Sequence, residues 1–137
     1  MRRPSLRSVE ECYRGSHVRV FRLDREAVMA RLAEGARTML AERREVVEVR
    51  LFGSMARGDA RPGSDADLLV VLRETPVPFL DRSPLLSPYL REVGVGCDIF
   101  AYTEAELTRL RSEGNPLVRA ADAEGISLAG REPCPES

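Results

Sequence analysis

Residues 66–73 constrain the fold more than any other stretch, because the run Leu-Leu-Val-Val-Leu within them is almost unbroken by polar residues. A strand without polar alternation is typical of burial on both faces, so we expect an interior strand here. Residues 46–52 alternate valine and leucine with more polar positions and stop at Gly53, which predicts a second strand.

The remaining patterns predict helices and further strands. Apolar residues recur at helical spacing over residues 25–44, and Thr103 with Glu106 forms a capping box that opens a later helix. The proline-rich residues 74–88 predict a crossover, with one short helix at 83–91. Further elements are predicted at 17–23 (a weak strand), 93–102 (a strand), 103–111 and 115–125 (helices) and 126–128 (a short strand). This order predicts a small α/β (α+β) fold, in which helices flank a mixed sheet.

Length predicts one domain. A chain of 137 residues can bury one core, so we expect an N-terminal arm at 1–16, a single domain at 17–130 and a flexible tail at 131–137. The longest aliphatic run is five residues, far short of the roughly 20 that span a membrane, and no apolar leader follows the N-terminal arginines. We therefore expect a cytoplasmic protein with no membrane partner.

Composition excludes several functions. The 21 basic and 22 acidic residues nearly cancel, which argues against bulk nucleic-acid binding. The three cysteines form no CxxC pair, so neither a disulfide framework nor a zinc site is supported. His17 is the only histidine, which leaves a hydrolase with a Ser54 nucleophile without a base to activate it.

Residues 51–71 hold the first candidate site. Gly53 and Ser54 stand where the first strand breaks, and backbone N–H groups and a hydroxyl at such a turn suit an anion such as phosphate. Asp65 and Asp67 are two apart at the mouth of the next strand, so their side chains point the same way. Two carboxylates opposite a phosphate-binding turn suit a Mg²⁺–nucleotide. Acidic residues after Pro-Gly-Ser are also common turn and cap formers, and this alternative stays open.

Asp98 favours the site over that alternative. It lies within the apolar run of residues 93–102, where we expect it to be buried, and an unpaired buried carboxylate is costly. Such a residue needs an arginine or a cation as its partner, and three carboxylates could then converge. Gly94 and Gly96, on the same side of the predicted strand, would leave room beside Asp98 for another backbone or a ligand.

Together these residues resemble the motif of the polymerase-β-type nucleotidyltransferases, in particular the minimal nucleotidyltransferases (MNT proteins) of bacteria and archaea. The resemblance covers residues 17–128 and implies a polymerase-β-like fold. Its parts are Gly53-Ser54, ten intervening residues, Asp65-Ala66-Asp67 leading into Leu-Leu-Val-Val, and Asp98 on a later strand.

The resemblance implies transfer of AMP from ATP to a hydroxyl. Asp65 and Asp67 would hold two Mg²⁺ ions, and Asp98 would complete the site of the ion that activates the acceptor. Asp98 would also accept the proton of the acceptor hydroxyl.

The same resemblance assigns nucleotide binding. Gly53 and Ser54 would bind the β- and γ-phosphates. Arg57 lies three residues past Ser54 on a predicted helical turn, so its guanidinium could reach the triphosphate. For Arg57 a solvated surface position stays open.

A protein partner is also implied. The chain has no room for a separate acceptor-binding domain, and many MNT proteins pair with a small helical HEPN protein, an RNase toxin. They act as antitoxins, as in type VII-like toxin–antitoxin pairs, by adenylylating a tyrosine of that toxin. Residues 74–88 are the candidate contact region, although a plain loop is equally compatible with them, and self-association stays open. The alternative function is a non-catalytic nucleotidyltransferase-like module that neutralises a partner by binding; three clustered carboxylates argue against it.

Overall fold

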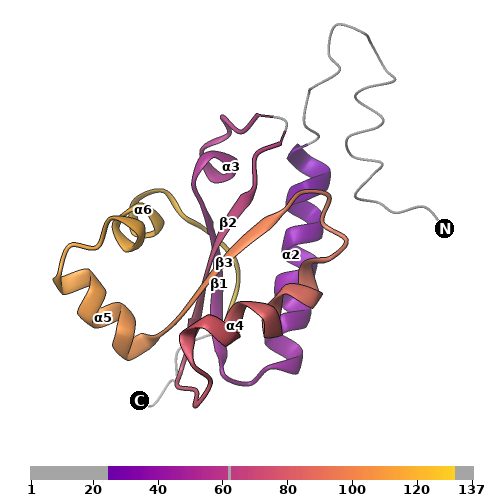
Figure 1. The fold of residues 1–137 in the computed structure, drawn as a ribbon. Coiled ribbons are helices and arrows are strands. Elements are labelled where there is room, and N and C mark those ends of the chain that lie inside the picture. Colours follow the sequence, from indigo (N-terminus) through magenta and orange to yellow (C-terminus); the bar gives the residue numbers. More distant parts are fainter. Residues whose placement is uncertain (1–24, 62, 132–137) are drawn as a thin grey trace, which may run out of the picture.

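A four-stranded mixed sheet runs through the middle of the molecule (Figure 1). The computed structural model describes residues 25–61 and 63–131. Within them the strands are β1 (Val46–Phe52), β2 (Ala66–Leu72), β3 (Cys97–Thr103) and β4 (Ile126–Gly130), in the order β3-β2-β1-β4. The sheet and its flanking helices confirm the predicted α+β fold class.

Some predictions fall on other parts of the chain. The N-terminal arm at 1–16, the weak strand at 17–23 and the tail after Arg131 lie outside the described residues. The division of the chain into an arm, one domain and a tail stays a prediction.

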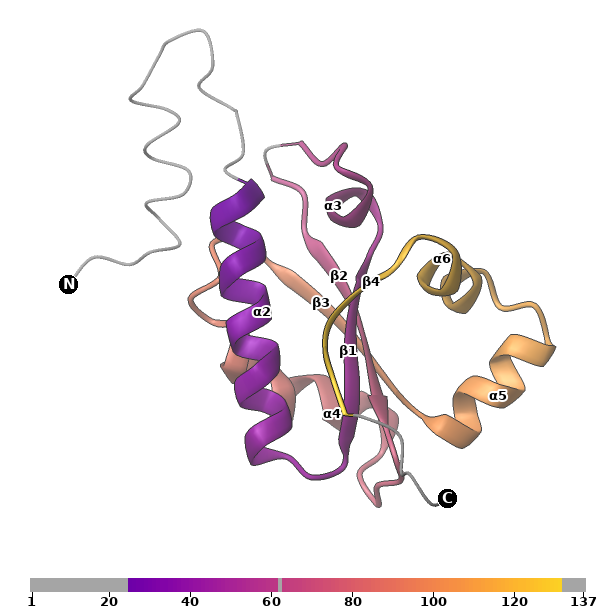
Figure 2. The ribbon, with the colours of Figure 1, turned by 180° about the vertical axis from the view of Figure 1, so that it is seen from behind.

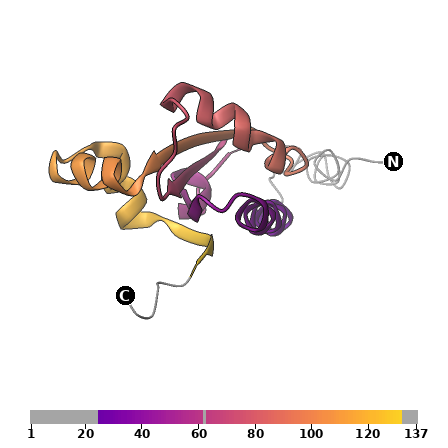
Figure 3. The same cartoon turned by 90° about the horizontal axis from the view of Figure 1, so that it is seen from below.

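Helices cover both faces of the sheet. In the described part of the chain they are α2 (Arg25–Glu42), α3 (Ser54–Arg57), α4 (Phe79–Leu86), the 3-10 helix η1 (Ser87–Leu90), α5 (Glu104–Ser112) and α6 (Pro116–Glu124). Figures 2 and 3 show α2 on one side of the strands and the pair α5–α6 on the other. Two apolar clusters result. One joins α2 and η1 to residues such as Leu51, Leu68 and Val70, and the other joins α5 and α6 to residues such as Phe52, Leu69 and Val71. Burial on both faces of β2 confirms the prediction from its apolar run.

Strand direction decides which ends of the strands meet. β1 is antiparallel to both β2 and β4, whereas β2 and β3 are parallel. The end of β1 therefore lies beside the starts of β2, β3 and β4. Every loop or helix that enters or leaves the sheet at this end can contribute to one site.

Gly35 in the middle of α2 has a packing reason. A Cβ on Gly35 would lie 2.5 Å from the carbonyl oxygen of Tyr89 and 2.9 Å from Cδ2 of Leu90. Glycine costs a helix interior about 1 kcal/mol relative to alanine. Here it lets η1 approach the backbone of α2, which no larger residue allows.

The predicted strand at 93–102 starts too early. Residues 91–95 form turns and bends, Gly94 has φ of 111°, and β3 begins only at Cys97. Val93 is 1% exposed because it is buried in the apolar cluster beneath α2, but it makes no strand pairing. The apolar alternation therefore predicted the burial of Val93 correctly, but it predicted the start of the strand wrongly.

The crossover helix also differs from the prediction of 83–91. α4 begins at Phe79 and contains Pro84, and η1 follows it without a break. Pro84 lacks the N–H that would bond to the carbonyl of Leu80, a residue 82% exposed, so water can take that place. The proline is tolerated because it lies on the solvent side of the helix.

A buried arginine fastens α4 to the sheet. Arg82 is 7% exposed and donates to the carbonyls of Val77 (2.9 Å) and Ala101 (3.1 Å). Its guanidinium also forms a two-pronged pair with Glu106, at 2.7 and 3.2 Å. Glu106 in turn accepts from the N–H of Thr103, which completes the predicted capping box of α5. One side chain thus holds the crossover, the end of β3 and the start of α5 together.

Replacing Arg82 with methionine should lower the free energy of unfolding by about 2–3 kcal/mol, since Glu106 and two carbonyls lose their donor. Urea unfolding followed by circular dichroism measures the change. The control is Arg109→Met, an exposed arginine of α5, which should cost no more than about 0.5 kcal/mol. Equal losses in the two variants would contradict the role of Arg82.

The same variant should change the response to acid. The hydrogen bond from Arg82, together with the N–H of Thr103, lowers the pKa of Glu106 below its ordinary value of 4.5. A carboxyl with a lowered pKa stabilises the fold above its unfolded pKa, and that stabilisation is lost as pH falls through the folded pKa. The difference in the free energy of unfolding between the wild type and Arg82→Met should therefore become smaller below about pH 4.5.

Candidate active site

Three predicted site residues meet at one end of the sheet. Phe52, the last residue of β1, pairs with Asp67, and Asp67 pairs with Asp98 on β3. Paired residues on neighbouring strands share a face, here the face that α5 and α6 cover. Asp65 lies just before β2, two residues from Asp67. The topology therefore brings together Asp65, Asp67 and Asp98, as the sequence predicts.

Gly53 is fixed by two independent constraints. Its φ of 81° and ψ of −160° belong to a region that essentially only glycine adopts. A Cβ at this position would also collide with the carboxylate oxygen of Asp67. The turn predicted to bind phosphate therefore packs directly against the central aspartate, and half-buried Ser54 follows it as the first residue of α3.

Two predictions about Asp98 are wrong. Asp98 is the second residue of β3, which forms an edge of the sheet within the described residues, and it is exposed, so burial does not force a partner on it. The space provided by Gly96 is filled by Asp65, whose Oδ1 lies 2.6 Å from where a Cβ of Gly96 would stand. The space at Gly96 is thus taken by the side chain of Asp65, and not by another backbone or a ligand beside Asp98.

The carboxylates repel one another. Burial raises the pKa of Asp67 above its ordinary value, and the charges of Asp98 and Asp65 raise it further, while Arg57 acts in the opposite direction. Burial, with the same two aspartates, raises the pKa of the Cys97 thiol to about 11. A cation placed among these groups would relieve the repulsion.

The donor set fits Mg²⁺ in kind and charge, since Mg²⁺ takes oxygen ligands and prefers carboxylates. In the part of the chain that the structure describes, no three acidic, histidine or cysteine side chains already stand in coordinating positions. Asp65, Asp67 and Asp98 could hold the ion only after their side chains turn.

The phosphate side of the site contains a residue that sequence reasoning missed. Oε2 of Glu124, the last residue of α6, accepts a hydrogen bond from the N–H of Gly53 (2.9 Å) and another from Nη1 of Arg57 (3.0 Å). Nε of Arg57 also donates to Asp59 at 3.2 Å. Arg57 is exposed, but it is an anion-pairing residue and not a freely solvated one. A carboxylate at the end of a helix, where the dipole disfavours anions, was the available signal in the sequence.

Arg50 sets the position of that helix end. It donates to the carbonyl of Gly125 at 3.0 Å, and a Cβ on Gly125 would lie 2.9 Å from Nε of Arg50. Val118 and Ala121 of α6 are fully buried against the sheet. The backbone next to Glu124 is therefore held in place beside β1.

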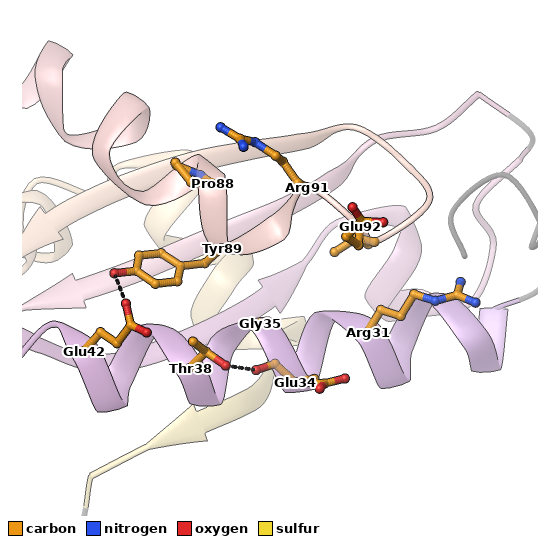
Figure 4. A pocket seen from close by; sticks show the side chains of 10 residues that line it. Arg31, Glu34, Gly35, Thr38, Glu42, Pro88, Tyr89, Arg91 and Glu92 are labelled. Atoms are coloured by element: carbon orange, nitrogen blue, oxygen red, sulfur yellow. Dashed lines mark hydrogen bonds between the residues drawn. The ribbon is translucent and has the colours of Figure 1, made fainter. Parts of the chain in front are cut away.

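A separate groove lies between α2 and the segment around η1 (Figure 4). Its volume is about 430 Å³, and the Tyr89 hydroxyl donates to Glu42 at 3.0 Å along its wall. None of the six predicted site residues lines it. The candidate site is instead an open surface at the end of the sheet.

Comparison with known families decides the class of the protein. A family model described as a nucleotidyltransferase domain matches residues 33–114, more than half of the chain. The chain belongs to this nucleotidyltransferase family. The match contains all six predicted site residues of the nucleotidyltransferase, whereas Glu124 lies beyond it.

Solved structures resemble this nucleotidyltransferase at low identity. A candidate nucleotidyltransferase from Sulfolobus solfataricus aligns with a TM-score of 0.52 and 19% identity, over 96% of this chain and 91% of that one, which supports the fold. A toxin–antitoxin structure with AMP-PNP covers 73% of this chain and 74% of its own, with 19% identity and a TM-score of 0.49. A mutant of the toxin–antitoxin pair MntA-HpeT covers 70% of each chain, with 18% identity and a TM-score of 0.48. The last two are too remote to support an inference about function.

No curated protein matches the nucleotidyltransferase chain. Among the helices of the described residues, none has the length and apolar character needed to cross a bilayer.

Replacing Gly53 with alanine should lower the free energy of unfolding by roughly 2–3 kcal/mol, because the backbone strain adds to the clash with Asp67. The matched control is Gly114→Ala: Gly114 has φ of 74°, but a Cβ there would meet nothing within 4 Å. It should cost only about 1 kcal/mol. Chemical denaturation of both variants measures the difference, and equal losses would contradict a close approach of Asp67 to Gly53.

Replacing Asp67 with asparagine should raise the midpoint of thermal unfolding at pH 7 in EDTA. The pKa of Asp67 is raised in the folded state, so its charge costs stability once pH exceeds the ordinary value of 3.8. Mg²⁺ should then stabilise the wild type and leave Asp67→Asn nearly unchanged.

Differential scanning calorimetry with and without Mg²⁺ provides the measurement. Asp81→Asn, an exposed aspartate in the first turn of α4, is the control and should behave like the wild type. Equal stabilisation of Asp67→Asn and wild type by Mg²⁺ would count against a metal site at Asp67.

Proposed function

We propose that the protein transfers AMP from ATP to a hydroxyl group on a partner protein. The observation that carries this proposal is the alignment of Asp67 with Asp98 on neighbouring strands, with Gly53 packed against Asp67. A carboxylate cluster that touches a glycine turn at the end of a sheet suits a nucleotide with its cation. Membership of the nucleotidyltransferase family supports the reaction class.

Asp65, Asp67 and Asp98 would hold Mg²⁺. The bound ions would lower the pKa of the acceptor hydroxyl and neutralise charge on the departing pyrophosphate. In the transfer, a bond forms between the acceptor oxygen and the α-phosphorus, and the bond from that phosphorus to the pyrophosphate oxygen breaks. Asp98 would take the proton of the acceptor, a role for which its exposed position on the edge strand is suited.

Gly53 and Ser54 would bind the β- and γ-phosphates, and the guanidinium of Arg57 would reach the triphosphate. Support comes from Glu124, because its carboxylate already receives hydrogen bonds from Gly53 and Arg57. A carboxylate oxygen stands in here for a phosphate oxygen, which carries similar charge and accepts from the same donors.

The partner we propose is a small helical HEPN-type toxin whose tyrosine accepts AMP, which would make this protein its antitoxin. The resemblance of the motif to the MNT proteins supports this part. The crossover adds an observation from the molecule itself, since Phe79, Leu80 and Leu85 of α4 are 40%, 82% and 40% exposed. Large apolar side chains gathered on one exposed helix are typical of a protein contact.

Transfer should be abolished by the double change Asp65→Asn with Asp67→Asn. The test incubates the purified protein with ATP labelled at the α-phosphate, Mg²⁺ and the product of the neighbouring gene, and it follows label in the protein bands. We expect labelling of the partner to fall at least about a hundredfold, because both ligand carboxylates are lost.

The control is Asp122→Asn, which breaks only an exposed ion pair with Arg111 and should leave labelling intact. Absence of transfer, or transfer undiminished in the double variant, would remove the catalytic proposal. Partner inhibition that persists in that case would favour the alternative, a non-catalytic module that acts by binding.

A further inference from the structure

The anion-binding site at the β1–α3 turn, which consists of the N–H of Gly53 and the guanidinium of Arg57, is occupied by a side chain of the protein itself. One oxygen of Glu124 accepts from both the N–H of Gly53 and Nη1 of Arg57, at 2.9 and 3.0 Å. The side chain of Glu124 is 25% exposed, so these bonds are partly shielded from water. The contact joins residues 71 positions apart, so it depends on the tertiary fold.

Two features of its surroundings disfavour a carboxylate here. Glu124 ends α6, and the carbonyl end of a helix repels negative charge. Its charge also acts on Asp67, whose pKa it helps to raise. The carboxylate stays because the donors of Gly53 and Arg57 attract an anion strongly enough to offset both effects.

A phosphate cannot bind the N–H of Gly53 while Glu124 holds it. This N–H carries one hydrogen, which points at the Glu124 carboxylate, and Arg57 uses two of its N–H groups on Glu124 and Asp59. A phosphate oxygen that takes the place of Oε2 must first displace it. If Glu124 stayed nearby, its charge would still repel the triphosphate.

We propose that Glu124 is an internal competitor for the phosphate site, which keeps the site closed until its side chain turns away. This inference rests on the proposed function in so far as Gly53 and Arg57 are taken as the triphosphate-binding residues. Only the side chain has to move, because Arg50 holds the carbonyl of Gly125 and α6 is buried through Val118 and Ala121.

ATP binding to the full chain, measured by isothermal titration calorimetry with Mg²⁺, tests the competition. Glu124→Ala removes the competing carboxylate and should bind ATP at least about tenfold more tightly than the wild type, since one charge-assisted hydrogen bond to the competitor already corresponds to that factor. Glu124→Gln keeps an acceptor without the charge and should lie between the two. Glu113→Gln, an exposed carboxylate at the end of α5, is the control and should match the wild type.

A second titration uses inorganic tripolyphosphate, which lacks the base and the sugar. The same order of affinities is expected, because the competition concerns phosphate oxygens alone. The amide signal of Gly53 in ¹⁵N-resolved spectra should shift in Glu124→Ala and, on adding tripolyphosphate, in the wild type. Thermal unfolding of each variant shows whether it is folded during the titrations.

The outcomes separate this inference from the proposed function. Tighter tripolyphosphate binding by Glu124→Ala, in a protein that never transfers AMP, would support the competitor and reject the transferase. The opposite result is intact AMP transfer together with an ATP affinity of folded Glu124→Ala that is equal to or weaker than that of the wild type. It would support the transferase and reject the competitor, since Glu124 would then be neutral or a positioning residue. Failure of every variant to bind either probe would overturn the inference.

Discussion

One row of residues across three strands underlies the site: Phe52, Asp67 and Asp98 are neighbours in the sheet. Side chains alternate between faces along a strand, so a slip of one residue between β1 and β2 would move Asp67 to the face of α2. The apolar residues of β2 prevent such a slip. Leu68 packs toward α2 and Leu69 packs toward α6, and both side chains are buried. Core packing on two faces therefore fixes the position of a carboxylate that itself adds no stability.

The site is electrostatically unfavourable by construction. Burial raises the pKa of Asp67 above its ordinary value, and the charges of Asp98 and Asp65 raise it further, so the ionised Asp67 carboxylate is disfavoured here. On the other side of Gly53, an arginine and a backbone N–H attract negative charge. One side of Gly53 therefore favours a cation and the other side favours an anion, which suits a ligand that carries a cation next to phosphates. The fold tolerates them because the apolar clusters on both faces, and the Arg82–Glu106 pair at the far end, hold the sheet together.

Local patterns predicted much of the fold. The limits of β1, the burial of β2, the capping box at Thr103 and the helix predicted at 115–125, which is α6, follow from neighbouring residues, and the structure confirms them. The errors arose where distant contacts decide. Val93 reads as strand but is buried by packing beneath α2, and α4 starts before the predicted position because Arg82 finds partners on β3 and α5.

Strand patterns predicted the neighbours of Asp67, including the distant Asp98, but no pattern predicted the contact between Gly53 and Glu124. Gly53, Asp65 and Asp67 stand within one short motif, whereas the contact between Gly53 and Glu124 requires α6 to return to the end of β1. Glu124 also lies beyond residues 33–114, the part that the family model matches. The anion-binding site of Gly53 and Arg57 lies in the matched region, and the carboxylate that occupies it comes from outside that region. Because Glu124 is not part of the carboxylate row, its side chain can turn away from Gly53 while the pairing of Phe52, Asp67 and Asp98 across the strands stays the same.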